Sequence, residues 1–441
     1  MSIAPLAWFR VLFGLIMLVE VGRYFLYDWV RQFYIAPKFH FAYFGFEWLK
    51  PWPGSGMYWH FAALGLLATC ITAGFCYRIA AALFFLGFTY VFLLDEVLYL
   101  NHFYLVCLLS FLMIFLPAHR SMSLDATLRP AIRAQTIPGW PIWLLRIQLG
   151  IVYFYAGLAK LNADWLRGEP IRTWLARRDD LPFLGPAATS EVTVAFFTWG
   201  GLVLDLLIFP ALLWRRTRVY AFVAATGFHV MNAAMFRIGI FPWLMLGATL
   251  LLFAPFGSPQ AASTVTKSWL PAARLTRILA AVYLAVQFLF PLRHFLYPGN
   301  VSWTEEGHRF SWHMKLRSKV AKARYEVFDP ESDESWEVDP RDYLEKWQIR
   351  KMPGQPDMVL QFAHYLADEF RRKGYRDVEV RADVRAALNG RRPRRLIDAD
   401  VDLARVQRSL GHATWILPLY EPLRPAGSAR PSEETGPEEA E

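Results

Sequence analysis

Residues 141–161 read PIWLLRIQLGIVYFYAGLAKL, a stretch in which most side chains are apolar. A helix that crosses a membrane needs about 20 mostly apolar residues, because the hydrocarbon layer is about 30 Å thick. This stretch therefore predicts a membrane-spanning helix. Candidate spans of the same kind recur along the chain, at residues 4–27, 57–75, 79–99, 102–118, 141–161, 195–214, 218–236, 239–256 and 275–297.

The sequence leaves the number of spans uncertain by one helix. Residues 102–118 are short for a span, and only residues 237–239 separate two later candidates. We therefore predict an all-α polytopic membrane domain with about eight or nine transmembrane helices over residues 1–298. The first candidate is too long for a signal peptide and carries charged residues, so we expect a retained helix.

The composition agrees with a membrane protein. Of the 441 residues, 55% are apolar and only 19% are charged, against about 25% charged in an average soluble domain. This balance excludes an ordinary soluble enzyme and a disordered chain. The net charge is +9, but the basic residues lie in short loops and near the C-terminus, which favours contact with anionic lipid and not with nucleic acid. Three cysteines are too few for a disulfide-stapled scaffold.

The composition changes near residue 299, where the chain becomes charged and mixed in character. We predict a small α+β extramembrane domain over residues 299–424, followed by a disordered acidic tail over residues 425–441. The expected elements of the domain are a hairpin of residues 322–328 and 335–338, an amphipathic helix over 357–373 and a strand over 378–384.

Basic residues in the short loops indicate the orientation. The second, fourth and sixth loops carry Arg78, Arg129 and Arg215 with few acidic neighbours, which favours a cytoplasmic N-terminus. With nine spans, the C-terminal domain then lies on the non-cytoplasmic side. We expect a multi-pass integral membrane protein.

Lys160 closes the span at residues 141–161, with Tyr153 and Gly157 on the same helical face. An ionisable side chain at membrane depth is costly, so each one is a candidate for a functional site. A buried lysine loses its proton more easily, and the neutral amine can then act as a general base. The alternative is a lysine that extends its amine into water at the interface.

Two further polar clusters lie in the apolar stretches. Asn101 and His102 begin one span, and His229 and Asn232 lie one turn apart in another. Helix capping explains the first cluster equally well, and a packed histidine explains the second. The alternation of the spans, however, places Asn101, His102 and Lys160 on one membrane face, with His229 somewhat deeper. That face carries the C-terminal domain, so we predict a polar pocket at membrane depth beneath a soluble domain.

The segment Tyr153–Trp165, which reads YFYAGLAKLNADW, closely resembles the catalytic-lysine segment of the vitamin K-dependent γ-glutamyl carboxylases. Other segments agree with that family in the same order, namely Asn101-His102, residues 228–232, 236–242, 310–314, 382–390 and 396–402. The resemblance covers roughly residues 5–424.

The resemblance implies an integral-membrane enzyme without a metal. It would oxygenate reduced vitamin K, a phylloquinone or menaquinone hydroquinone, to the epoxide. A strongly basic form of the vitamin would then take a γ-proton from a glutamate, and CO2 would add to that carbon. The implied co-substrates are O2 and CO2, and the implied partners are a glutamate-containing protein or peptide and the lipid membrane. Such a base survives only where water is excluded, which a pocket at membrane depth provides.

By match to the family motif, Lys160 is the base that activates the hydroquinone, and Asn101 and His102 line its ring. The animal enzymes have two adjacent lysines here, whereas this chain has Ala159 before Lys160. The chain also stops soon after residues 415–418, where the animal enzymes continue. This short form looks bacterial, and the resemblance supports epoxidation more strongly than glutamate carboxylation.

The remaining candidates are binding residues. His229, Asn232 and Tyr153 would contribute to the quinol site, while Trp312, Arg317 and Lys319 fall in a strip that resembles the glutamate-binding region. The arginine and lysine of that strip would hold a carboxylate. The alternative for this strip is a solvated basic strand.

Three other functions remain open at this point. The first is a vitamin K epoxidase that does not carboxylate glutamate. The second is a non-catalytic membrane module or transporter on the same fold. The third is a haem-binding electron carrier with His102 and His229 as axial ligands.

Overall fold

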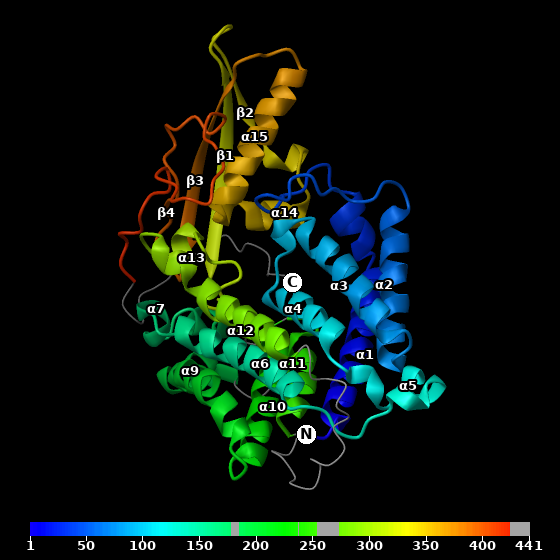
Figure 1. Ribbon diagram of the computed structural model, residues 1–441. Coiled ribbons are helices and arrows are strands. Elements are labelled where there is room, and N and C mark those ends of the chain that lie inside the picture. The colour runs from blue at the N-terminus through cyan, green and yellow to red at the C-terminus, as the bar shows by residue number, and fades with distance from the viewer. Residues whose placement is uncertain (178–184, 237, 254–272, 424–441) are drawn as a thin grey trace.

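The computed structural model describes residues 1–177, 185–236, 238–253 and 273–423 (Figure 1). The predicted tail at residues 425–441 lies outside the described residues. The long helices of the first part are α1 (Ala4–Leu26), α2 (Gly56–Ala73), α3 (Tyr77–Leu93), α4 (Asn101–Phe115), α6 (Trp140–Ala159), α9 (Glu191–Leu213), α10 (Arg218–Met235), α11 (Phe241–Thr249) and α12 (Ala273–Leu289). The short ones are α5 (Leu124–Leu128), α7 (Ala163–Leu166) and α8 (Ile171–Leu175).

Each predicted span overlaps one long helix, which confirms the helical reading of all of these stretches. Within the described part of the chain, five helical segments are long and apolar enough to cross a membrane, namely Ala4–Leu26, Gly56–Ala73, Trp140–Ala159, Glu191–Leu213 and Leu275–Leu296. Helices α3, α4 and the segment Phe241–Phe253 are apolar but shorter. The protein is therefore a helical membrane protein, and the count of eight or nine spans stays a prediction.

The outer faces of the helices are apolar. Large side chains such as Trp59, Val192 and Leu279 are more than half exposed. In water, apolar surface of this extent would favour aggregation or partner binding. In a bilayer it faces lipid tails, so the surface agrees with a membrane location.

The C-terminal part folds as a small antiparallel sheet covered by a helix. The strands are β1 (Lys319–Asp329), β2 (Glu334–Val338), β3 (Glu379–Leu388) and β4 (Arg394–Arg395), in the order β2-β1-β3-β4. The helices are α13 (Val301–Thr304), α14 (Lys346–Lys351) and α15 (Pro356–Arg372). The predicted hairpin, amphipathic helix and strand are thus confirmed.

The sheet and α15 share one core, because α15 buries its apolar stripe against it. Phe362 and Leu366 of α15 and Val380 and Val384 of β3 are fully buried. Fully burying a side chain of this kind stabilises a fold by about 1.5–3 kcal/mol. The same core also contains Phe41, which comes from the loop after α1. The C-terminal domain is therefore packed onto the helical part.

A buried ion pair adds a second link between the two parts. Asp164 of α7 accepts hydrogen bonds from Arg391 at 2.6 and 2.8 Å and from Asn389 at 2.8 Å. Burial alone would raise the pKa of Asp164, but the hydrogen bonds from Arg391 and Asn389 outweigh it, and the pKa is lowered. The stabilisation is therefore present above the ordinary pKa of 3.8 and is lost as the pH falls through the lowered value.

Asp164→Asn should lower the free energy of unfolding by about 2–4 kcal/mol, because it leaves the buried guanidinium of Arg391 without its charged partner. The measurement is thermal unfolding of the detergent-solubilised protein. Asp339→Asn is the matched control, since the Asp339–Arg341 pair lies on the surface and should not affect the midpoint. Equal midpoints for both variants would show that the link does not hold the domains together.

Candidate functional site

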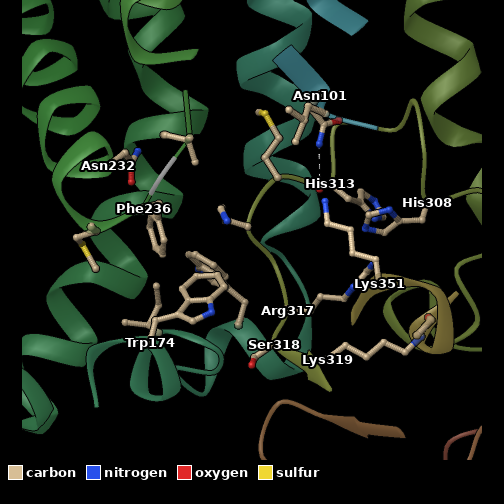
Figure 2. Close-up of a pocket in the computed structure, with 18 of the residues that line it drawn as sticks. Asn101, Trp174, Asn232, Phe236, His308, His313, Arg317, Ser318, Lys319 and Lys351 are labelled. Carbon is tan, nitrogen blue, oxygen red and sulfur yellow. Dashed lines mark hydrogen bonds between the residues drawn. The ribbon is translucent and has the colours of Figure 1, made fainter. Parts of the chain in front are cut away.

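A cavity of about 2320 Å³ lies where the helical part meets the C-terminal domain. Figure 2 shows Asn232 and Phe236 on one side, facing His313 and Arg317 on the other. The cavity is lined by Asn101, His102, Tyr153, Lys160, His229, Asn232, Arg317 and Lys319, all of which are predicted site residues. The structure therefore brings together side chains that are separated by more than 200 positions in the chain.

Lys160 is the residue that follows α6, and its ammonium group is buried and paired. The side chain is 7% exposed, and Nζ donates a hydrogen bond to Asp205 Oδ2 at 2.5 Å. The same nitrogen lies 5.1 Å from the ring centroid of Trp165. Lys160 does not extend into water, so the interfacial alternative is wrong.

The close approach of α6 and α9 makes this pair possible. Gly157 lies one turn before Lys160, and a Cβ atom there would lie 3.1 Å from the backbone nitrogen of Leu206 and closer still to its side chain. A larger residue would push the helices apart. On α9, a Cβ at Gly201 would lie 3.8 Å from Cε of Lys160. Small residues on both helices therefore let the Lys160 side chain reach Asp205.

His229 is held by Tyr153 on the same wall of the cavity. The Tyr153 hydroxyl lies 2.8 Å from Nε2 of His229, and both side chains are at least 97% buried. Nδ1 of His229 has no hydrogen-bond partner among the described residues. The ring centroids of His102 and His229 each lie 6.0 Å from that of Phe241. The two histidines thus flank one aromatic ring.

Asn101 joins the membrane helices to the C-terminal domain. Its side-chain nitrogen donates to the backbone oxygen of His313 at 3.4 Å, and its oxygen accepts from the Tyr99 hydroxyl at 3.0 Å (Figure 2). This arrangement explains the residue at least partly as a link. His102, the next residue, is 7% exposed and lines the cavity.

Arg317 and Lys319 are partly buried and both contact one carboxylate, that of Glu305. Nη2 of Arg317 lies 2.6 Å and Nζ of Lys319 lies 3.1 Å from its oxygens. Lys319 also donates to the backbone oxygens of Trp303 and Gly354, so its three protons are satisfied within the protein. Nη1 of Arg317, in contrast, is buried without a partner in the described part of the chain. The alternative of a solvated basic strand does not describe these two side chains. Of the two, only Arg317 keeps a donor nitrogen that a bound carboxylate could use.

Two histidines stand close to Arg317 in the C-terminal wall. The rings of His308 and His313 are 5.1 Å apart. Burial, followed by the neighbouring histidine and arginine charges, lowers the pKa of His313 to about 3, and burial lowers the pKa of His308 well below its usual range. Both rings are therefore neutral near pH 7. The positive charge that an anionic guest would meet here therefore comes from the lysines and arginines that line the cavity, Arg317 among them, and not from these two histidines.

The chain matches two known families along its sequence. Residues 1–256 match the family described as "HTTM domain", and residues 272–422 match "Vitamin K-dependent gamma-carboxylase, lumenal domain". The chain belongs to the vitamin K-dependent gamma-carboxylase family. The match to the lumenal domain places the C-terminal domain on the non-cytoplasmic side.

One relative of this chain is an uncharacterized protein, YitO, of Bacillus subtilis (strain 168). It is 28% identical over 128 residues, which is 26% of this chain and 40% of that protein. The chain thus spans less than half the length of this relative in the match. No solved structure matches the chain.

Trp312 is the predicted site residue that does not line the cavity. Its side chain is fully buried within the helical core, with its ring centroid 5.0 Å from that of Tyr104. The backbone at Trp312 has a φ of +58°, and Phe310 before it has +61°. These left-handed turns direct the indole into the membrane helices and away from the cavity.

Asp205 lines the cavity but was not among the residues predicted from the sequence. A signal was present, because Asp205 is the sole charged residue in the apolar run 192–213. An ionisable group at membrane depth should have marked it as Lys160 was marked. Its pairing with Lys160, however, depends on how α6 and α9 pack. Among the described residues, no group of three His, Cys, Asp or Glu side chains could hold a metal ion.

Replacing Lys319 should change how stability depends on pH. Burial, partly opposed by Glu305, lowers the pKa of Lys319 from 10.5 to about 8. Between these values the unfolded chain binds the proton and the folded chain does not, so stability rises with pH. The free energy of unfolding of wild type relative to Lys319→Met should therefore increase by about 1 kcal/mol from pH 7 to pH 9.

The measurement is denaturant unfolding at the two pH values. Lys346→Met is the control, because Lys346 lies exposed on α14 and its removal should give a difference that does not change with pH. A flat difference for Lys319→Met as well would mean that Lys319 keeps its proton in the folded protein.

Proposed function

We propose that this member of the family is a vitamin K-dependent γ-glutamyl carboxylase. It would oxygenate vitamin K hydroquinone to the epoxide and carboxylate glutamate in a protein or peptide, in a bacterial cell membrane. The observation that carries the proposal is the continuity of one cavity, from the Lys160–Asp205 pair among the membrane helices to Arg317 in the C-terminal domain. A lipid-soluble guest and a water-soluble guest can meet only in such a space.

The lining residues fit an aromatic quinol. Phe241 and Trp174 offer apolar ring faces, and His229 offers a buried Nδ1 that has no partner in the described residues. An unsatisfied buried polar atom costs about 1–3 kcal/mol, and a ring hydroxyl of the guest would satisfy it. His102 and Asn101 line the same space. Reduced vitamin K, when bound, supplies through its reaction with O2 the strong base that takes a proton from the glutamate γ-carbon.

In this proposal, Lys160 removes the hydroxyl proton of the guest. Its ammonium can pass a proton to Asp205 across 2.5 Å without any change in the net charge of the pair. Nζ is then a neutral amine and can accept a proton from a neighbouring hydroxyl. Asp205 acts through Lys160, as a positioning residue that also holds the proton.

In this proposal, Arg317 holds the glutamate. Glu305 accepts from Nη2, which leaves Nη1 for a second carboxylate. A charge-assisted hydrogen bond of this kind is stronger than a neutral one. Lys319 supports the arrangement by pairing with Glu305, and not by contact with the guest.

The alternatives have less support from the geometry. In the haem alternative, Nε2 of His229 would ligate iron, but this nitrogen is hydrogen-bonded to Tyr153. An epoxidase that does not carboxylate glutamate needs only the membrane side of the cavity. It does not account for Nη1 of Arg317, which is buried without a hydrogen-bond partner among the described residues.

One incubation tests the proposal directly. The protein in nanodiscs is supplied with vitamin K hydroquinone, O2, labelled bicarbonate and a glutamate-rich peptide. Epoxide together with label in the peptide is the expected result. Epoxide without label would indicate the epoxidase, and the absence of both products would favour the non-catalytic module.

Lys160→Met should reduce epoxide formation by about 10²-fold or more, because loss of a general base typically costs 10²–10⁴-fold. Asp205→Asn should give an intermediate rate, since the amine remains but its acidic partner does not. The measurement is epoxide formed per minute in nanodiscs. Lys346→Met is the control and should match wild type. A Lys160→Met variant with wild-type epoxidation would remove Lys160 as the base.

Arg317→Gln should raise KM for the peptide by about 10–100-fold, the range expected for a lost hydrogen bond to a charged group. Epoxide formation should change much less. Arg341→Gln, at an exposed arginine of the same domain, is the matched control. Equal loss of epoxidation and peptide carboxylation in Arg317→Gln would argue for a structural role.

A further inference from the structure

The sheet of the C-terminal domain has one covered face and one open face. Helix α15 packs on the covered face, where Val384 of β3 is fully buried. Side chains alternate along a strand, so the next residue, Arg385, points to the other face, where it is exposed. Lys322 and Arg324 of β1 are exposed in the same way. The open face therefore carries basic side chains.

Three basic residues lie directly opposite one another on neighbouring strands of this face. Lys322 of β1 pairs with Arg385 of β3, and Arg385 pairs with Arg395 of β4. Residues in such positions have Cβ atoms about 4.5–5.5 Å apart, and like charges there destabilise a sheet. We call these three residues the cationic row. A bound anion would offset the repulsion that the row brings to the fold.

The cationic row is only partly neutralised within the domain. Asp383 accepts hydrogen bonds from Nε of Arg385 at 3.3 Å and from Nε of Arg395 at 3.2 Å. The two arginine side chains stay 61% and 52% exposed. Each guanidinium has five N–H donors, and its contact with Asp383 uses one of them. One carboxylate thus serves two exposed cations.

The cavity extends onto this face of the sheet. Val320 and Ala387 form the cross-strand pair that precedes the row on β1, and both line the cavity. Val320 is itself 42% exposed. The lining then continues with Lys322 and Arg324 of β1 and with Asp383 and Arg385 of β3. A peptide that leaves the cavity along β1 would pass the apolar pair and then meet the cationic row.

The length of β1 limits the distance between the row and the proposed glutamate site. Arg317 precedes Lys322 by five residues. A chain spans at most about 3.6 Å per residue, so the two residues lie at most about 18 Å apart. An extended peptide whose acceptor glutamate is held by Arg317 would therefore reach the row with residues about five positions away.

We propose that the cationic row is a second recognition site, which binds acidic side chains that flank the acceptor glutamate in an extended peptide. The inference rests on the proposed function and adds a sequence preference to it. The flanking acids bind as counterions and are not themselves modified, so aspartate serves as well as glutamate. Two acids at alternate positions point to one side of an extended chain, about 7 Å apart, and reach two cations of the row.

Peptide binding to the protein in phosphatidylcholine nanodiscs tests the row without turnover. The acidic peptide carries one glutamate, with aspartates five and seven residues away on each side, and the neutral peptide has asparagine at those positions. A third peptide keeps the aspartates and has glutamine in place of glutamate. The variant is Arg385→Gln/Arg395→Gln. Arg371→Gln/Arg372→Gln is the matched control, because these exposed arginines of α15 also pair with acids and do not line the cavity.

We expect wild type and the control to bind the acidic peptide about 5-fold or more tightly than the neutral one, since each exposed ion pair contributes modestly. The variant should bind these two peptides within 2-fold of each other. Arg385→Glu/Arg395→Glu should instead prefer a peptide with lysines in place of the aspartates. A purely structural role of the two arginines would not produce this reversal.

Equal affinity of wild type for the acidic and neutral peptides would overturn the proposal and leave the proposed function intact. Unchanged peptide binding in the Gln variant, together with loss of thermal stabilisation by phosphatidylglycerol, would assign the row to lipid headgroups and also overturn it. The third peptide should depend on the row as the acidic one does. If it does so while no label enters any peptide in the carboxylation assay, the proposed function fails and the row stands as a site for acidic peptides.

Discussion

The ion pair between Lys160 and Asp205 is the interaction around which the membrane half of the site is arranged. A lone charge at this depth would be costly, and two opposite charges are tolerable only when they meet closely. That requirement explains the small residues at positions 157 and 201, which bring α6 and α9 together. It also explains why the amine lies at the cavity, since its acidic neighbour holds it there and prevents it from extending to the membrane surface.

The sequence predicted the location of the polar side chains better than their individual roles. Because neighbouring spans alternate in direction, Asn101, His102, Lys160 and His229 had to lie toward one face of the membrane, and they line one cavity. Asp205 escaped attention because an isolated acid in an apolar run has no visible partner until the helices are packed.

Residues 312–319 show where a linear motif is insufficient. Positive φ values at Trp312 and Lys315 turn the chain, so that the indole enters the helical core. Lys319 folds back onto the carbonyl groups of Trp303 and Gly354, which are far from it in sequence. A motif match identifies the segment, but backbone turns and long-range hydrogen bonds decide which of its side chains face the cavity.

The number of membrane spans could not be predicted from apolar stretches alone, because α3, α4 and α11 are apolar but shorter than a full span.

The size of the cavity has a consequence for the order of events. At about 2320 Å³ it holds tens of water molecules, since each takes about 30 Å³ in the liquid. A strong base is quenched by water within its reach, so under the proposed function this water would have to leave the cavity before the reaction. Under the proposed function, water would therefore be excluded from the cavity only when the lipid-soluble guest and the water-soluble guest are bound together. Such an enzyme would react only when both guests are bound, and this requirement would protect the strong base from reaction with water.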